Sequence, residues 1–167
     1  MPDKDAGTPR IFIIRHGETE WSKSGQYTGK TDIPLTEYGE KQVKASADLM
    51  YGSGKLIDPA NVARVYLSPR KRAIRTYQLL SGQQEGYEIT ESLAEWNYGS
   101  SEYEGIKTNE IREKRKAHGL DKERPWDIWT DGCEGGEYDT LIPHLPSCQL
   151  LIHFEDPQHK SQPASTA

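Results

Sequence analysis

The stretch Ile11-Phe12-Ile13-Ile14-Arg15-His16-Gly17-Glu18-Thr19 carries the strongest fold signal in this chain. Its first four residues are β-branched or aromatic without interruption, a pattern typical of a short strand buried on both faces. Arg15, His16 and Gly17 then follow the carboxyl end of this expected strand. Because α/β proteins place their ligands at the carboxyl ends of strands, the stretch predicts a strand that leads directly into a functional site.

Helical and strand patterns alternate along the rest of the chain. Residues 17–35 are rich in Thr, Ser and Gly and predict a long loop, after which Thr36 is the expected N-cap of a helix that ends near residue 51. We then expect, in order, a strand at 64–68, a helix opened by Pro69, a strand at 87–90, a helix at 107–118 and a helical turn at 125–129. This order predicts an α/β fold with three layers, in which helices flank a mostly parallel sheet.

The composition limits the kinds of partner. The chain has 167 residues, which is enough for one domain. Its net charge of −5 argues against nucleic acid as a partner. No apolar run approaches the length of a membrane span, and the polar start at residues 1–5 does not resemble a signal peptide, so we expect a cytoplasmic protein without membrane contact. Two cysteines are too few for a disulfide framework, and no Cys/His spacing resembles a zinc site. We expect no metal, and the oligomeric state stays open.

Arg15, His16 and Gly17 together have the chemistry of a phosphate site. An arginine binds phosphoryl oxygens in a bidentate manner, a glycine lets the backbone approach an oxyanion, and a neutral imidazole can attack phosphorus. A single histidine after a strand is more often an ordinary hydrogen-bonded residue. The surrounding sequence therefore has to decide between the two interpretations.

Several further motifs favour the phosphate site, because together they resemble the histidine phosphatase (phosphoglycerate mutase-like) superfamily. The matching segments are residues 15–19, Thr28-Gly29, residues 35–39, the Ser-Pro-x-x-Arg-Ala-x-x-Thr helix at 68–76 and the acid-bearing loop at 93–99. Residues 21–29 and 119–126 look most like the fungal sedoheptulose-1,7-bisphosphatase members. The resemblance implies a phosphoglycerate mutase-like fold and hydrolysis of a small phosphorylated metabolite, a sugar bisphosphate, without a cofactor.

The resemblance also implies a role for eight residues. His16 would be the nucleophile that forms a phosphohistidine, and Glu95 would protonate the leaving oxygen. The substrate-binding residues would be Arg15, Arg72, Thr28, Gly29, Ser22 and Tyr98. Mutases of the superfamily carry Asn at the position of Ser22, which favours a phosphatase over the alternative of a phosphoglycerate mutase.

The resemblance ends after Glu137. We therefore expect residues 1–137 to be the N-terminal part of a histidine phosphatase domain, and residues 138–167 to be a divergent, largely disordered tail that leaves the fold incomplete at the C-terminus. The second histidine of the family, in a His-Gly pair after a later strand, has no match. Leu150-Leu151-Ile152-His153 imitates this pattern, but Phe154 replaces the glycine, so we do not assign His153 to the site. A catalytically inactive fragment with at most weak phosphate binding is the alternative function.

Overall fold

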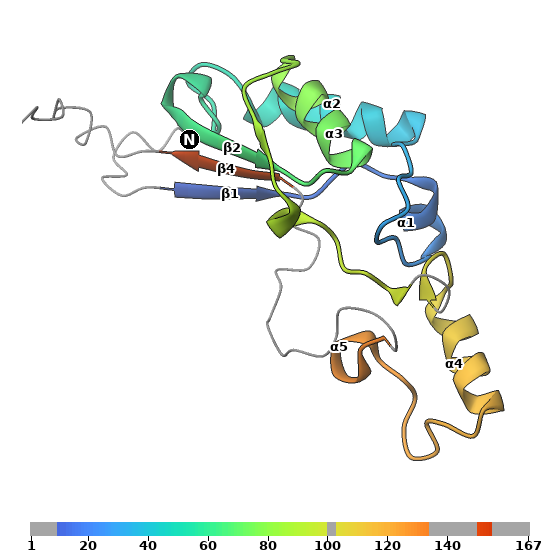
Figure 1. The fold of residues 1–167 in the computed structure, drawn as a ribbon. Coiled ribbons are helices and arrows are strands. Elements are labelled where there is room, and N and C mark those ends of the chain that lie inside the picture. Colours follow the sequence, from blue (N-terminus) through green and yellow to red (C-terminus); the bar gives the residue numbers. More distant parts are fainter. Residues whose placement is uncertain (1–9, 100–102, 134–149, 155–167) are drawn as a thin grey trace, which may run out of the picture.

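The computed structural model describes residues 10–99, 103–133 and 150–154. Its elements are β1 (Arg10–Ile14), α1 (Glu20–Ser24), α2 (Glu37–Met50), β2 (Val62–Leu67), α3 (Lys71–Ser81), β3 (Glu88–Ile89), α4 (Thr108–Ala117), α5 (Ile128–Asp131) and β4 (Leu150–Phe154), with 3-10 turns at Pro59–Asn61 and Glu91–Leu93. Figure 1 shows α2 and α3 packed over the sheet, whereas α4 and α5 lie away from it. The prediction of an α/β fold is confirmed.

The sheet contains one strand that we did not predict. The strand order is β1-β4-β2-β3, and β4 is antiparallel to both of its neighbours, so β1, β2 and β3 share one direction. Residues Leu150–Phe154 of the divergent tail therefore fill the position between β1 and β2. A parallel strand at this position would need a crossover helix before it, whereas an antiparallel strand needs none. The other residues of 138–167 lie outside the described part of the chain.

The register of β4 decides the question of His153. Leu150 pairs with Ile14 at the carboxyl end of β1, and His153 pairs with Ile11 near its amino end. β4 thus begins beside the carboxyl end of β1 and runs away from it. His153 is at the end of the sheet opposite to His16, which agrees with leaving it out of the site.

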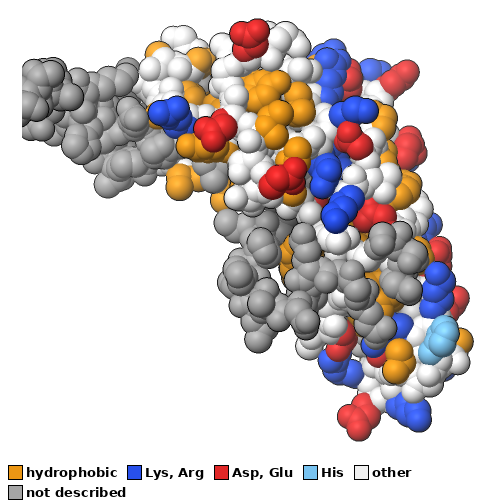
Figure 2. Space-filling model, viewed as in Figure 1, with side chains coloured by type: hydrophobic (Ala, Val, Ile, Leu, Met, Phe, Trp, Pro, Cys, Tyr) orange, Lys and Arg blue, Asp and Glu red, His pale blue; other side chains and the backbone are white. Residues whose placement is uncertain are grey.

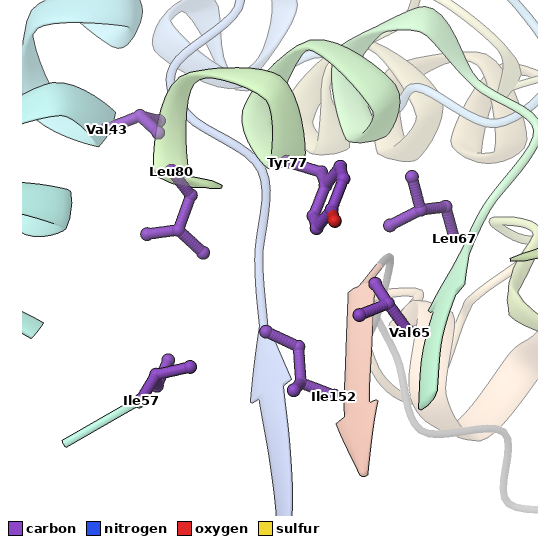
Figure 3. Packing of buried hydrophobic residues seen from close by; sticks show 7 residues of the cluster. All are labelled: Val43, Ile57, Val65, Leu67, Tyr77, Leu80 and Ile152. Atoms are coloured by element: carbon purple, nitrogen blue, oxygen red, sulfur yellow. The ribbon is translucent and has the colours of Figure 1, made fainter. Parts of the chain in front are cut away.

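A first hydrophobic core joins one face of the sheet to α2 and α3. Its buried members point into the space between sheet and helices (Figure 3): Val43, Ile57, Val65, Leu67, Tyr77, Leu80 and Ile152. On the other face of the sheet, Ile11 and Ile13 are 60% and 50% exposed. Of the three expected layers, the described residues thus contain the sheet and one helical layer.

Two glycines bring α2 close to the end of β1. A Cβ atom on Gly39 would lie 2.2 Å from the carbonyl oxygen of Glu18, and one on Gly17 would lie 2.8 Å from the carbonyl oxygen of Gly39. Thr36 caps α2 as predicted, because its hydroxyl accepts the N–H of Gly39 at 2.9 Å and donates to the Glu18 carboxylate at 2.8 Å. These contacts fix the segment that follows His16.

Three local predictions were wrong in detail. The expected loop at 17–35 contains α1, which is stabilised by reciprocal hydrogen bonds between Thr19 and Ser22. The sequence did not reveal this capping box because its third helical position is Ser22, where the usual signal is Glu or Gln. Pro69 precedes α3 rather than forming its first turn, since α3 begins at Lys71. The turn expected at 125–129 is α5, which begins at Ile128 after its N-cap Asp127.

A second hydrophobic core lies beneath α4 and α5. It is formed by Tyr103, Ile111, Trp126, Ile128 and Cys133. Trp126 is fully buried, and its indole N–H donates to the carbonyl of Gly132 at 3.0 Å. A buried tryptophan normally needs such a partner for its N–H group. The α4–α5 region is thus a packed unit with its own interior.

The surface carries both signs of charge. On the visible face, Lys and Arg lie next to Asp and Glu over the described part of the chain (Figure 2), and Arg75 pairs with Glu40 at 2.7 Å. None of the helices in the described ranges is long and apolar enough to cross a membrane.

Candidate active site

A cavity of about 300 Å³ brings together six of the eight predicted site residues, namely Arg15, His16, Ser22, Thr28, Glu95 and Tyr98. The remaining wall consists of Gly25, Gln26, Tyr27, Trp96, Thr108, Ile128 and Trp129. The first group includes the residues at the carboxyl end of β1, and the wall includes residues of α4 and α5. The cavity therefore joins the sheet to the second core.

His16 is held as a neutral imidazole. Its Nδ1 lies 2.6 Å from the carbonyl oxygen of Gly17. Since a carbonyl only accepts, this contact places the ring proton on Nδ1 and leaves the lone pair on Nε2. Burial is the largest influence and lowers the pKa of His16 to about 4, the charges of Arg72 and Arg15 lower it as well, and the Gly17 contact opposes them. At neutral pH the imidazole carries a free lone pair, as a nucleophile must.

The backbone beside His16 is fixed from α3. The N–H of Gly17 donates to the Thr76 hydroxyl at 3.2 Å, and this hydroxyl donates to the carbonyl of Arg72 at 2.7 Å. Thr76 and Arg72 are both buried, one helical turn apart on α3. The Ser-Pro-x-x-Arg-Ala-x-x-Thr helix thus positions the Arg-His-Gly segment through Thr76.

Arg15 and Arg72 differ in how free their guanidinium groups are. Arg15 is exposed, and it makes no hydrogen bond or ion pair with the described residues. Arg72 is fully buried and donates to the carbonyls of Thr31 at 3.0 Å and Gly29 at 3.1 Å, while its Nε has no partner within the described ranges. Arg15 can therefore clamp an anion directly. Arg72 and Gly29 are the two predicted site residues that do not line the cavity, and Arg72 instead organises the loop at residues 28–31.

Glu104 completes this loop, and the sequence did not identify it. Its carboxylate accepts the N–H of Gly29 at 3.0 Å and the N–H of Thr31 at 2.9 Å. Gly29 is tightly enclosed, because a Cβ atom there would lie 2.1 Å from the carbonyl oxygen of Trp96. The glycine of the Thr28-Gly29 motif is thus required by packing. Glu104 carries no recognisable motif, so only the tertiary structure reveals the contact.

Ser22 is less free than a ligand would be. Its hydroxyl donates to the Thr19 carbonyl at 2.9 Å and accepts the Thr19 N–H at 2.8 Å. A hydroxyl has one proton, and the cap of α1 uses it. Ser22 can donate to a phosphate only if it breaks this bond.

Glu95 and Tyr98 also line the cavity. The carboxylate of Glu95 accepts the N–H of Trp96 at 3.2 Å. Burial and then the negative charge of Glu95 raise the pKa of Tyr98, so its phenol stays protonated as a donor. Burial lowers the pKa of Arg72, and Glu95 is the first of the carboxylates that oppose this effect. Glu95 therefore lies within electrostatic reach of both residues.

A larger cavity of about 680 Å³ shares Arg15 and His16 with the first one. Most of its other described lining residues are apolar, including Ile14, Val43 and Leu80, whereas the smaller cavity adds the hydroxyl groups of Ser22, Tyr27 and Thr28. The smaller cavity is therefore the better phosphate site. Within residues 10–99, 103–133 and 150–154, no three His, Cys, Asp or Glu side chains come together in a way that could hold a metal ion.

Comparison with known proteins gives the family of this chain. The family model of the histidine phosphatase superfamily (branch 1) matches residues 11–140. The sedoheptulose 1,7-bisphosphatase of Saccharomyces cerevisiae is 50% identical over 137 residues, which cover 78% of this chain and 50% of that protein. An acid phosphatase of Mycobacterium tuberculosis is 41% identical over 77% of this chain and 55% of its own length.

The fold comparison agrees. A solved structure of an open reading frame product from Mycobacterium tuberculosis superposes with a TM-score of 0.55 at 33% identity, covering 77% of this chain and 57% of that one. The chain thus spans about half the length of the curated relatives that it matches. Its motifs, its fold and the family match together place this chain in the histidine phosphatase superfamily.

Proposed function

We propose that this chain carries the nucleophile and the phosphate-binding groups of a phosphatase that hydrolyses a small phosphorylated metabolite through a phosphohistidine. The observation that carries the proposal is His16: it lines the cavity, and its Nδ1 contact with the Gly17 carbonyl leaves Nε2 unprotonated. The identity to a sedoheptulose 1,7-bisphosphatase favours a sugar bisphosphate as the substrate.

In the proposed reaction, Nε2 of His16 attacks the phosphorus, and the bond from phosphorus to the ester oxygen breaks. Glu95 acts as the general acid and gives a proton to the leaving alkoxide. Arg15 and the Thr28 hydroxyl line the cavity and bind the phosphoryl oxygens. The charge of the buried Arg72, which acts on His16, adds to the stabilisation of the charge that develops. The Gly17 carbonyl stabilises the positive charge that spreads onto the Nδ1–H side of the phosphorylated ring.

Water then completes the cycle. It attacks the phosphorus and breaks the P–N bond, while the carboxylate of Glu95 takes its proton. The net reaction converts an ester and water into an alcohol and orthophosphate, and it returns both His16 and Glu95 to their starting forms. Neither step needs a redox partner.

A binding protein without turnover is the second candidate. The resemblance calls for a second histidine at the phosphate, and among the described residues His16 is the only histidine that lines the cavity. Loss of one fixed donor to a developing charge typically reduces a rate by about 10²–10³-fold. An inactive chain would then still bind orthophosphate through Arg15 and the loop at 28–31.

Trapping of the phosphoenzyme tests the proposal. The whole chain is mixed with a ³²P-labelled phosphate ester and quenched, and the label should be acid-labile and base-stable, as phosphohistidine is. The His16→Asn variant should carry no label and show no turnover. Label retained in this variant would overturn the assignment. Orthophosphate binding without label or turnover in the unaltered chain would favour the binding protein instead.

A further inference from the structure

One part of the cavity wall differs in chemical character from the residues expected to bind phosphate. This part consists of Gln26, Tyr27, Thr108, Ile128 and Trp129, which are all uncharged. The cation Arg15 and the nucleophile His16 form another part of the same lining. A substrate with its phosphoryl group at Arg15 and His16 would meet the uncharged part of the wall with its leaving group.

Trp129 gives this wall an exposed aromatic surface. It is 58% exposed, whereas Trp126, only three residues earlier, is fully buried in the second core. The indole rings of Trp129 and Trp96 lie 5.7 Å apart between centroids. An indole at the edge of a polar cavity offers a flat apolar surface for a ligand, in addition to its contact with Trp96.

Trp129 is also held in place. Its backbone N–H donates to the side chain of Asp127 at 3.0 Å, and Asp127 caps α5. The N–H of Asp127 in turn donates to Asp131 at 2.8 Å, and Arg124 pairs with Asp131. Because α5 is anchored at both ends, the ring needs little ordering when a ligand binds.

Two hydroxyl groups lie on the same wall. The Tyr27 and Thr108 oxygens are 3.1 Å apart, and either one can be the donor. One of their two protons lies between them, so the pair keeps one proton and acceptor lone pairs for a ligand. Hydroxyls beside an apolar ring match a polyol, which has C–H groups on its faces and O–H groups at its edges. A carboxylate would meet no cation on this wall and would lose hydration without compensation.

We infer that Trp129, with the Tyr27–Thr108 hydroxyl pair, forms a subsite for the polyhydroxylated leaving group of a sugar phosphate. This inference rests on the proposed phosphate site at Arg15 and His16. It predicts that Trp129 contributes to the affinity for the sugar part of the ligand and contributes nothing to the affinity for the phosphoryl part.

Isothermal titration with two non-hydrolysable ligands tests the subsite. One ligand is methylphosphonate, and the other is the phosphonate analogue of fructose 1-phosphate, so both carry the same charged group. Trp129→Ala should weaken binding of the sugar phosphonate by about tenfold, roughly the strength of one aromatic contact, and change methylphosphonate binding less than twofold. Thr108→Val should weaken the sugar ligand by about threefold or more.

A matched control and two further outcomes make the result decisive. Tyr38 is another exposed aromatic residue, at 60%, and it does not line the cavity, so Tyr38→Ala should leave both affinities unchanged. If Trp129→Ala weakens both ligands equally, or neither, the subsite is wrong while the phosphate site stands. If the unaltered chain binds neither ligand, the proposed function fails together with the subsite.

Discussion

The two hydrophobic cores of this molecule are built from different residues and serve the cavity in different ways. The first core is mainly aliphatic, lies between the sheet and its helices, and supports the segment that contains His16. The second core is rich in aromatic residues, lies beneath α4 and α5, and supports Tyr27 directly and Trp129 through Trp96. The nucleophile thus depends on regular elements, whereas the leaving-group wall depends on short helices and loops around one tryptophan. This division predicts that the two parts can be damaged separately.

The largest effect is expected in the second core. Trp126→Ala removes a fully buried side chain and leaves the Gly132 carbonyl without its partner, so the free energy of unfolding should fall by about 3–5 kcal/mol. Trp129→Ala is the matched control, because the same side chain is removed from an exposed position, and it should cost about 1 kcal/mol or less. Urea denaturation followed by circular dichroism gives both values. Equal losses of unfolding free energy in the two variants would contradict the assignment of Trp126 to a buried core.

A slightly smaller effect is expected in the first core, at the strand from the tail. Ile152 is fully buried between the sheet and the helices, so Ile152→Ala should cost about 2–5 kcal/mol. Ile11 on the neighbouring strand β1 is 60% exposed, and Ile11→Ala should cost about 0.5 kcal/mol. The same urea experiment compares the two. If Ile152→Ala costs no more than Ile11→Ala, β4 does not lie in the centre of the sheet.

A smaller effect, on the affinity for orthophosphate, is expected in the loop at residues 28–31, which Glu104 holds. Glu104→Gln keeps the shape of the side chain but removes the charge that accepts the N–H groups of Gly29 and Thr31. Orthophosphate binding, measured by calorimetry, should weaken by about tenfold, because a hydrogen bond to a charged group contributes about 1.5–3 kcal/mol and part of it remains. Glu113→Gln, on the exposed surface of α4, is the control. Unchanged binding in Glu104→Gln would show that the loop does not need this carboxylate.

The sequence predicts the parts of the molecule that depend on local signals. Thr36 marks the start of α2 because a cap depends on its immediate neighbours, and the run at 11–14 marks β1 because its apolar pattern is continuous. The Arg-His-Gly motif likewise locates the cavity. β4 was missed because its pairing depends on strands more than 80 residues away in the chain. Glu104 was missed for the same reason, since it lies 75 residues from Gly29.

The state of His16 is the central claim, and nuclear magnetic resonance tests it directly. The ring nitrogens of the ¹⁵N-labelled chain are followed through a pH titration, and the His16→Asn variant identifies the His16 signals. We expect a neutral ring with its proton on Nδ1 at pH 7 and a pKa of about 4, because burial and the charges of Arg72 and Arg15 disfavour the protonated form. A pKa at or above the ordinary value of 6.5, or a proton on Nε2, would contradict the proposed nucleophile.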